Sequence, residues 1–434
     1  MKQVLRKGFV RLPSRRPGRP SLWRHRDLRL VVPARTLSFV GDTLAMIALT
    51  LRVHAQGGGT VGIALLMAAF ALPSVLMMGV AGAVADRFDS RTVLLVSTAV
   101  QVLACTGLAL VAGAGPTYLL VVVLQCGQAV AGPTWGALIP RIVGDDEVGR
   151  VLALQQSLIA VTAVAGAALA GLVVGAHGAA AALLLDAATF GGLLAAAALV
   201  RTRRGGRPVG GPADRIAGRP PRPRTLDGLR VLRRDRLVWL VFAWTVPFVI
   251  VLEAVNVVEV FLVRDDLGAS ATSYGVLQGF FGAGAVGGSW LAGRCGDDGE
   301  RVRALLLGLG GTAVAIALAG VSPTVAFLAA VLVVLGGSNG AVNAVLGPLY
   351  VVRSAEAQRG RVLAAVTGVS RTGSVLALGL GGLAGGVLGA RQTFVVSGGL
   401  ALLVVVALVW SLRGVERTAP REAVPSPVGP ALAT

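Results

Sequence analysis

Charged residues are scarce in this chain. Asp, Glu, Lys and Arg make up 14% of its 434 residues, whereas soluble domains usually carry about 25%. Lysine is nearly missing, because only Lys2 and Lys7 stand among the 40 basic residues. The body of the chain therefore has no lysine for a phosphate-binding loop or a Schiff base, which argues against ATP-driven transport by this chain alone.

Cysteine and histidine are also rare, with three of each. Cys105 and Cys126 lie inside apolar segments and Cys295 in a basic loop, so we expect neither a disulfide nor a metal site. No histidine lies deep in an apolar segment, and no H-E-x-x-H or G-x-S-x-G motif occurs. The sequence therefore predicts that the protein is not an enzyme.

Long apolar runs are what the chain has in place of charge. Hydrophobic residues make up 55% of it, and its mean hydropathy is +0.77. A run of about 20 apolar residues spans the hydrocarbon layer, and backbone groups in lipid must bond internally, so each run should be a helix. We expect an all-α membrane protein with twelve transmembrane helices at residues 28–51, 60–84, 92–113, 117–140, 151–175, 179–200, 237–262, 272–293, 302–321, 324–350, 362–388 and 392–412.

Arginine is concentrated in every second gap between these runs. Only Arg52, Arg264 and Arg391 lie in the alternate gaps. Cytoplasmic loops retain positive charge, so the pattern predicts that both termini lie in the cytoplasm. The net charge of +19 sits in short loops beside apolar runs and not on one folded face; we therefore expect contact with anionic lipid headgroups and no nucleic acid.

Two related halves are indicated by a repeat and by a central basic segment. The segment Gly-Arg-Val-Leu-Ala occurs at 149–153 and again at 360–364. A parallel duplication of this kind predicts two pseudo-symmetric six-helix bundles with a substrate site between them at the middle of the membrane. The expected parts are a basic cytoplasmic arm at 1–27, an N-terminal bundle at 28–200, an Arg/Gly/Pro-rich linker at 201–236, a C-terminal bundle at 237–413 and a disordered cytoplasmic tail at 414–434.

The loop after the second run carries a recognisable motif. It begins at Gly82 and contains Asp86, Arg87 and Arg91, and it resembles the signature loop of the major facilitator superfamily, G-x-L-A-D-R-x-G-R-R. An aspartate in place of the family glycine, Asp89, resembles the branch that includes macrolide exporters and the enterobactin exporter. The resemblance implies a cytoplasmic gate, in which Gly82 permits close helix packing, Asp86 accepts hydrogen bonds from a helix start and the two arginines pair with carboxylates. The alternative is an ordinary positive-inside loop.

Ionisable side chains inside a membrane are costly, and they usually line cavities. Asp42 is the first candidate for a proton-coupling carboxylate and Glu253 the second; alternatively, Asp42 is held permanently by a structural partner. Arg371 could neutralise a carboxylate or contact an anionic substrate, and Asp186 could be structural. The candidates for proton coupling or for lining the cavity are Arg35, Asp42, Asp186, Glu253, Asn256 and Arg371.

Polar amides and a few aromatic residues within the runs are candidates for substrate contact. For the amides, bonding between helices is an equal alternative. Glu259 lies five residues before Arg264, so we expect it at the membrane interface. The substrate candidates are Gln125, Gln128, Trp244, Phe248, Asn339 and Asn343.

The resemblance implies a monomeric secondary transporter of a bacterial cytoplasmic membrane. It would export a small amphipathic molecule, such as an antibiotic, a drug-like metabolite or a siderophore, by proton antiport through alternating access. The proton gradient would be its energy source, and no cofactor is expected. Two alternatives stay open: an importer or uniporter of the same fold, and a transport-inactive membrane sensor.

Overall fold

The computed structural model of the protein describes residues 21–203, 225–353 and 358–418, and every regular element in these ranges is helical. The arm at 1–20, the linker at 204–224 and the tail at 419–434 lie outside the described residues. The first part of the chain holds the short helix η1 (Leu22–Arg24), α1 (Arg26–Ala55), α2 (Gly59–Leu76), α3 (Met78–Arg87), α4 (Ser90–Leu110), α5 (Ala114–Val143) and α6 (Asp145–Leu199). The second holds α8 (Thr225–Leu232), α9 (Arg236–Phe261), the π-helical turn η2 (Leu262–Asp266), α10 (Ala271–Ala292), α11 (Asp298–Gly320), α12 (Val325–Val352), α13 (Arg359–Leu388) and α14 (Ala390–Thr418).

The outer surface of the molecule is apolar. Within the described residues, ten helices are long and apolar enough to cross a membrane: α1, α2, α4, α5, α6, α9 continued by η2, α11, α12, α13 and α14. Many large apolar side chains on these helices are mostly exposed, among them Leu110, Leu307, Val387 and Trp410. An apolar surface of this extent is costly in water and favourable against lipid tails.

Helix α6 is two membrane-length helices joined at one residue. Gly178 has a φ of 79°, outside the helical region and accessible to glycine without strain. Twenty residues of straight helix extend about 30 Å, yet Gly166 and Asp186 both pack against residues 40–43 of α1. The chain therefore reverses at Gly178, where the sequence predicts a boundary between two spans.

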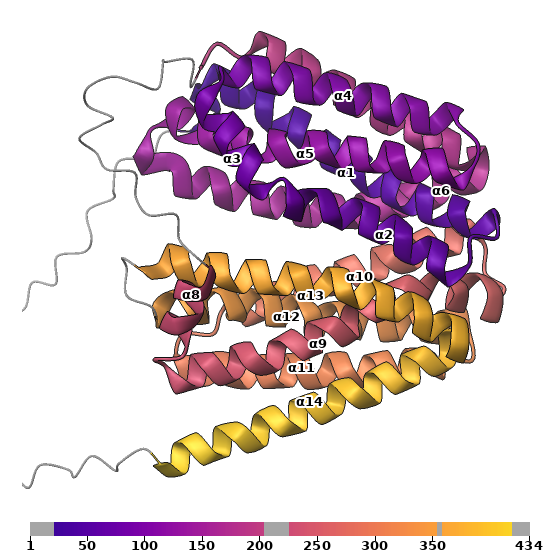
Figure 1. The fold of residues 1–434 in the computed structure, drawn as a ribbon, viewed down its shortest axis with the longest axis vertical. Helices are drawn as coiled ribbons and strands as arrows, with labels where there is room; N and C mark the ends of the chain where they lie inside the picture. The colour runs from indigo at the N-terminus through magenta and orange to yellow at the C-terminus, as the bar shows by residue number, and fades with distance from the viewer. Residues whose placement is uncertain (1–20, 204–224, 354–357, 419–434) are drawn as a thin grey trace, which may run out of the picture.

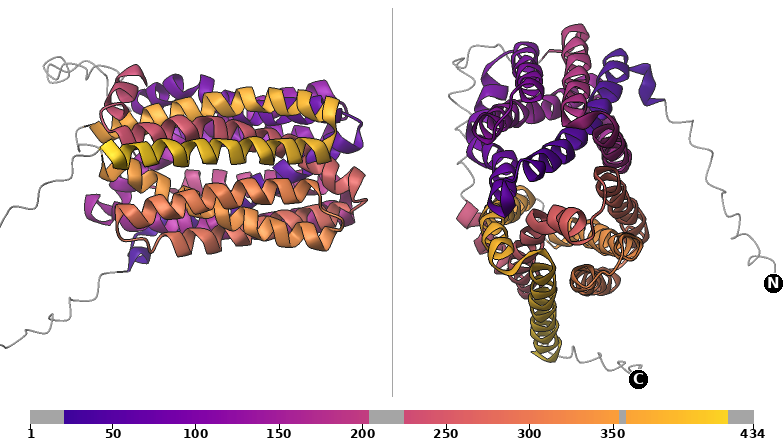
Figure 2. Two further views of the ribbon diagram at one scale, coloured as in Figure 1. Left: turned by 90° about the horizontal axis from the view of Figure 1, so that it is seen from below. Right: turned by 90° about the vertical axis from the view of Figure 1, so that its right-hand side faces the viewer.

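The helices form two bodies that lie side by side (Figure 1). Helices α1 to α6 make the N-terminal half and α8 to α14 the C-terminal half, and the other views show the same division (Figure 2). Both described chain ends, α3 and α8 lie at the same end of the molecule, which we call the arginine-rich end. The opposite end, with the turns at 56–58 and 267–270, is called the far end.

Contacts between the halves are concentrated toward the far end. His54 pairs with Asp265 at 2.9 Å, and the Thr60 hydroxyl donates to the carbonyl of Gly382 at 2.7 Å. A Cβ on Gly171 would lie 2.8 Å from the Cα of Gly275, so α6 and α10 touch backbone to backbone. The buried hydrophobic cluster also runs from α1 and α2 into α9, η2 and α10. The far end is therefore closed in this conformation.

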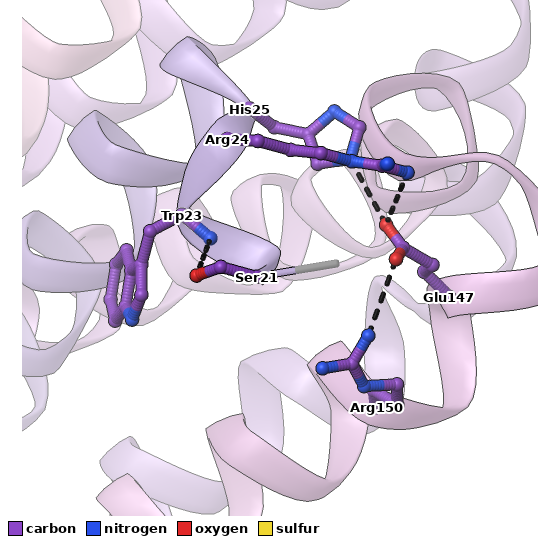
Figure 3. A network of polar contacts seen from close by, with 6 residues as sticks. All are labelled: Ser21, Trp23, Arg24, His25, Glu147 and Arg150. Atoms are coloured by element: carbon purple, nitrogen blue, oxygen red, sulfur yellow. Dashed lines mark hydrogen bonds and ion pairs between the residues drawn. The ribbon is translucent and has the colours of Figure 1, made fainter. Parts of the chain in front are cut away.

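A polar network holds the N-terminal half together at the arginine-rich end (Figure 3). Glu147, at the start of α6, pairs with Arg24 at 3.3 Å, His25 at 3.0 Å and Arg150 at 3.2 Å. The segment before α1 is thereby tied to the turn before the fifth predicted span. The shared Glu147 carboxylate is buried while its partners are partly exposed, so one group orders several side chains at once.

The observed element ends differ from the expected domain boundaries at three places. Helix α14 continues to Thr418, so the region expected to be a disordered tail from 414 begins as helix. The linker expected at 201–236 contains the helix α8, whose Leu229, Val231 and Leu232 pack onto the C-terminal half. The second predicted span is divided into α2 and α3 at Met77, four residues after Pro73.

Candidate functional site

A cavity of about 640 Å³ lies between the two halves. It is lined from α1 and α2 on one side and from α9 to α14 on the other. This volume falls within the usual range of about 300–1,000 Å³ for sites that bind small molecules. The only charged side chains among the described residues that line it are Glu253 and Glu259; its amides are Asn256, Gln278, Asn339 and Asn343.

Glu253 lies in the middle of α9 and is held by two neutral donors. The Asn256 amide donates to Oε2 at 3.0 Å, and the Ser374 hydroxyl of α13 donates to Oε1 at 3.2 Å. Both carboxylate oxygens therefore accept a hydrogen bond. The predicted grouping of Glu253 and Asn256 in the cavity is observed, and Ser374 is a partner that the sequence does not indicate.

Glu259 also faces the cavity, which corrects the expectation that it lies at the membrane interface. The Gln278 amide of α10 donates to its Oε2 at 3.1 Å and to the Tyr274 hydroxyl oxygen at 3.3 Å. The proximity of Arg264 in the sequence is misleading, because the Arg264 side chain donates to the carbonyl of Ala269 instead. The spacing of three between Glu253, Asn256 and Glu259 was the available signal.

The other substrate candidates of the C-terminal half are divided between cavity and packing. Phe248, Asn339 and Asn343 line the central cavity, and Asn343 donates to the Asn339 amide oxygen at 2.9 Å. Trp244 does not line it. Its indole N–H donates to the Ser411 hydroxyl of α14 at 3.2 Å, so Trp244 joins two helices in this conformation, and its predicted ligand contact stays a prediction.

Asp42 ends a chain of amides inside the N-terminal half. Gln101 of α4 donates to Gln128 of α5 at 2.9 Å, and Gln128 donates to Asp42 at 3.2 Å. Asp42, Gln125 and Gln128 line a side cavity of about 210 Å³, which shares Met46 with the central cavity. Asp42 is therefore beside the central cavity and not in its lining.

Asp186 lies behind Asp42 and is fully buried. The Cys105 thiol of α4 donates to its Oδ2 at 3.3 Å, and the Thr189 hydroxyl donates to its Oδ1 at 3.2 Å. This is the structural role in joining neighbouring helices that the sequence leaves open for Asp186. A Cβ on Gly41 of α1 would overlap both Oδ1 of Asp186 and Oγ1 of Thr189.

Replacing Gly41 with alanine should destabilise the protein. Alanine is ordinarily better than glycine in a helix by about 0.5–1 kcal/mol, but here its methyl group would displace Asp186 from its partners, at a cost of about 1–3 kcal/mol. We expect a lower unfolding temperature in detergent. Gly191→Ala is the matched control, because a Cβ there would meet nothing within 4 Å. Equal stability of the two variants would contradict the role of Gly41.

Arg35 packs beside two aromatic rings. Its guanidinium carbon lies 5.4 Å from the Phe39 ring centre and 6.0 Å from that of Trp135. These residues line a second side cavity of about 240 Å³, together with Gln128. Among the described side chains none forms a hydrogen bond or ion pair with Arg35, so its interaction here is of the cation–π kind.

Arg371 joins the halves and does not neutralise a carboxylate among the described residues. Its guanidinium donates to the Ser74 hydroxyl of α2 at 2.8 Å. Ser74 lies near the break between α2 and α3, so this contact is closer to the arginine-rich end than the others. The hydrogen bond joins α13 of the C-terminal half to α2 of the N-terminal half.

The expected gate contacts are not formed in the part of the chain that the structure describes. A Cβ on Gly82 would meet nothing within 4 Å, so the predicted close packing is wrong for this conformation. Arg91 donates to the carbonyl of Ala198 in its own half, and neither it nor Arg87 pairs with a described carboxylate. The physical reason is that α3 lies at the end where the halves are less closely joined. The Asp86 side chain is outside the described part of the structure.

Comparison with known proteins gives the same architecture. A bacterial homologue of the human lysosomal transporter Spinster, solved in an inward-facing and unoccupied conformation, superposes with a TM-score of 0.70 at 14% identity, over 93% of this chain and 100% of that one. A mutant of the nucleoside transporter NupG superposes with a TM-score of 0.68 at 14% identity, over 89% and 99%. At such identities the likeness concerns the fold alone.

Sequence comparison adds the family. The uncharacterized MFS-type transporter YfiS of Bacillus subtilis strain 168 is 23% identical over 404 residues, which are 90% of this chain and 94% of that protein. The model of the transmembrane secretion effector family matches residues 22–430. This is a family of membrane transporters and not of enzymes, and the multi-pass architecture agrees with it. The chain therefore belongs to the transmembrane secretion effector family of the major facilitator superfamily.

Proposed function

We propose that this protein exports a small amphipathic molecule by proton antiport through alternating access. The observation that carries the proposal is the central cavity, which lies between two helical bodies and combines an apolar wall with two carboxylates and several amides. A site between two halves is what a transporter needs if the halves rock about a bound substrate. The antibiotic, drug-like metabolite or siderophore class is part of this proposal and rests on the motif resemblance.

We infer a twelve-span topology with both termini in the cytoplasm. The ten apolar helices become twelve spans in two steps. Helix α6 counts as two spans, and the glycine-rich α10 counts as one more; α2 and α3 together count as one. The positive-inside pattern then makes the arginine-rich end cytoplasmic and the far end external. In this assignment the structure is inward-facing. The bundles would comprise 28–200 and 237–413, joined by the linker at 201–236.

Asp42 and Glu253 are the coupling candidates within this proposal. Each is held by neutral hydrogen-bond donors from another helix, so protonation would change contacts between helices without breaking an ion pair. A proton can drive a conformational change only if its affinity differs between the two conformations. Arg35 of α1 and Arg371 of α13 remain candidates for the transport path. Gly82, Asp86, Arg87 and Arg91 would form the gate in the opposite, outward-facing conformation.

Flux in vesicles of known orientation tests this function. Protein in inverted membrane vesicles that are acidic inside should accumulate its substrate, and a protonophore should abolish the accumulation. For exchange of one proton, a difference of one pH unit supports about tenfold accumulation. A panel should include cationic, neutral and anionic amphiphiles, since the cargo is unidentified.

The two alternatives give different results in this assay. An importer would deplete the acidic vesicles of substrate, and a uniporter would equilibrate it without regard to pH. A transport-inactive sensor would behave like protein-free vesicles with every compound. Added ATP should change nothing in any case, because the chain carries no phosphate-binding lysine loop.

A further inference from the structure

The charge of the central cavity has one sign. Glu253 and Glu259 both line it, six residues apart on α9, which places them about 9 Å apart along the helix axis. Among the described residues that line the cavity there is no arginine, lysine or histidine. An ionised carboxylate at membrane depth needs a counter-charge or a ring of donors, so the missing counter-charge calls for an explanation.

The hydrogen bonds around the two carboxylates do not supply this counter-charge. Both oxygens of Glu253 accept from neutral groups, Asn256 and Ser374. Neither donor carries a positive charge, so these hydrogen bonds orient the carboxyl group without neutralising it. Glu259 receives only the Gln278 amide among the described residues. Neutral donors therefore do not cancel the negative charge that either group carries when it is ionised.

A second polar group in the same cavity lacks a partner. Thr312 of α11 lines the cavity and is fully buried, and its hydroxyl forms no hydrogen bond with a described residue. A buried hydroxyl without a partner costs free energy and is unusual in a native structure. A ligand with an N–H group could donate to this oxygen only after a neighbouring side chain moves, since the hydroxyl has no accessible surface in this conformation.

The remaining wall is suited to an organic cation. Phe248, Phe281 and Phe394 line the cavity together with Met46 and Met67. Aromatic faces attract cations, and methionine side chains adapt to ligands of different shape. An inorganic ion is not favoured, because no group of three or more His, Cys, Asp or Glu side chains in the described residues could hold a metal.

We propose that the central cavity binds an amphipathic organic cation, with its positive group beside Glu253 and Glu259 and its apolar part against the phenylalanines. This proposal rests on the transport function only in taking the central cavity as the substrate site. It names a charge class that the fold and the family do not. The alternative substrate, an anionic amphiphile, would have to enter a cavity with two uncompensated carboxylates.

Two probes of nearly equal shape and opposite charge test the proposal. Purified protein in a neutral detergent is titrated with tetraphenylphosphonium and, separately, with tetraphenylborate, and binding is followed calorimetrically. We expect tetraphenylphosphonium to bind at least about tenfold more tightly, the lower end of what a close charge pair contributes. Equal affinity, a preference for tetraphenylborate, or no binding of either probe would overturn the proposal.

Variants that remove a negative charge show which carboxyl groups cause the preference for the cationic probe. Glu253→Gln and Glu259→Gln should each weaken tetraphenylphosphonium binding, and the double variant should remove the preference for the cation. Glu300→Gln is the matched control, because Glu300 is exposed at the start of α11 and outside the cavity. An unchanged preference in the double variant would contradict the site.

The comparison of the two probes on the unmodified protein needs no variant, so poor folding of a mutant cannot decide the outcome. Failure of the transport proposal can be distinguished from failure of the charge-class proposal. If pH-driven flux is found for a neutral or anionic compound while the cation preference is absent, only the charge class is wrong. If the cation binds but no compound moves in vesicles, the cavity is a binding site and the transport proposal is wrong.

Discussion

Replacing Asp42 with asparagine should remove the ability of a pH gradient to drive transport while leaving the central cavity able to bind its ligand. In acidic inverted vesicles, substrate accumulation should fall from about tenfold per exchanged proton and pH unit to no accumulation. Equilibrium exchange of labelled substrate across the same membrane should continue. The measurement is therefore a pair of fluxes, one driven by pH and one downhill.

The expected separation follows from where Asp42 lies. Its carboxylate accepts from Gln128, which in turn accepts from Gln101, so both amides direct their donors toward Asp42. Asparagine keeps an oxygen acceptor of the same size at this position but cannot take up a proton. Because Asp42 is outside the lining of the central cavity, the change should spare ligand contacts.

Glu253 should behave differently in the same assay. Its carboxylate lines the cavity and would contact the substrate, so Glu253→Gln should weaken both the pH-driven flux and the downhill exchange. Glu300→Gln serves as the control for the loss of one carboxylate elsewhere. Wild-type coupling in both Asp42→Asn and Glu253→Gln would show that neither group carries the proton.

The arrangement of the helices is largely predictable from this sequence, because the physics that sets it is local and repeated. Apolar runs must be helical in lipid, and the gap between the runs at 151–175 and 179–200 coincides with the reversal at Gly178. The break at Met77 was not predicted. The break depends on how the backbone groups of the turn after Pro73 are hydrogen-bonded, and hydropathy does not report this.

The site was only partly predictable because it depends on helix rotation and on the conformation of the whole molecule. The sequence places Glu253 in a span but does not show that Glu259, near Arg264, turns inward to Gln278. It likewise does not show that Trp244 turns away to Ser411. Gly82 illustrates the second limit, because the close packing expected of it is absent from this conformation and the sequence does not say which conformation a contact belongs to.

Replacing Gly275 with valine should shift the protein away from the conformation that is closed at its far end. In this conformation a Cβ on Gly275 would overlap the Cα and N of Gly171 across the boundary between α10 and α6. Both neighbours are backbone atoms, so they cannot rotate aside as a side chain can. Overpacking of about 1–3 kcal/mol in one conformation changes the ratio of the two conformations by about 5- to 150-fold.

Distances between the halves would report this shift. Gln56 and Ser270 are exposed and lie at the far end on opposite halves, so a spin label can be attached to each. Double electron–electron resonance should show one short distance in the unmodified protein and a longer, dominant population in Gly275→Val. Transport should fall in parallel, because a transporter that works by alternating access cannot complete its cycle if the far end does not close.

Gly287→Val provides the control on the same helix. A Cβ at Gly287 would meet nothing within 4 Å, so the two substitutions share their cost in helix propensity and differ only in the contact between the halves. We expect the Gly287 variant to keep the short distance and the flux of the unmodified protein. If Gly275→Val also kept both, the contact between α6 and α10 would not govern closure, and the alternating-access proposal would lose its structural basis at the far end.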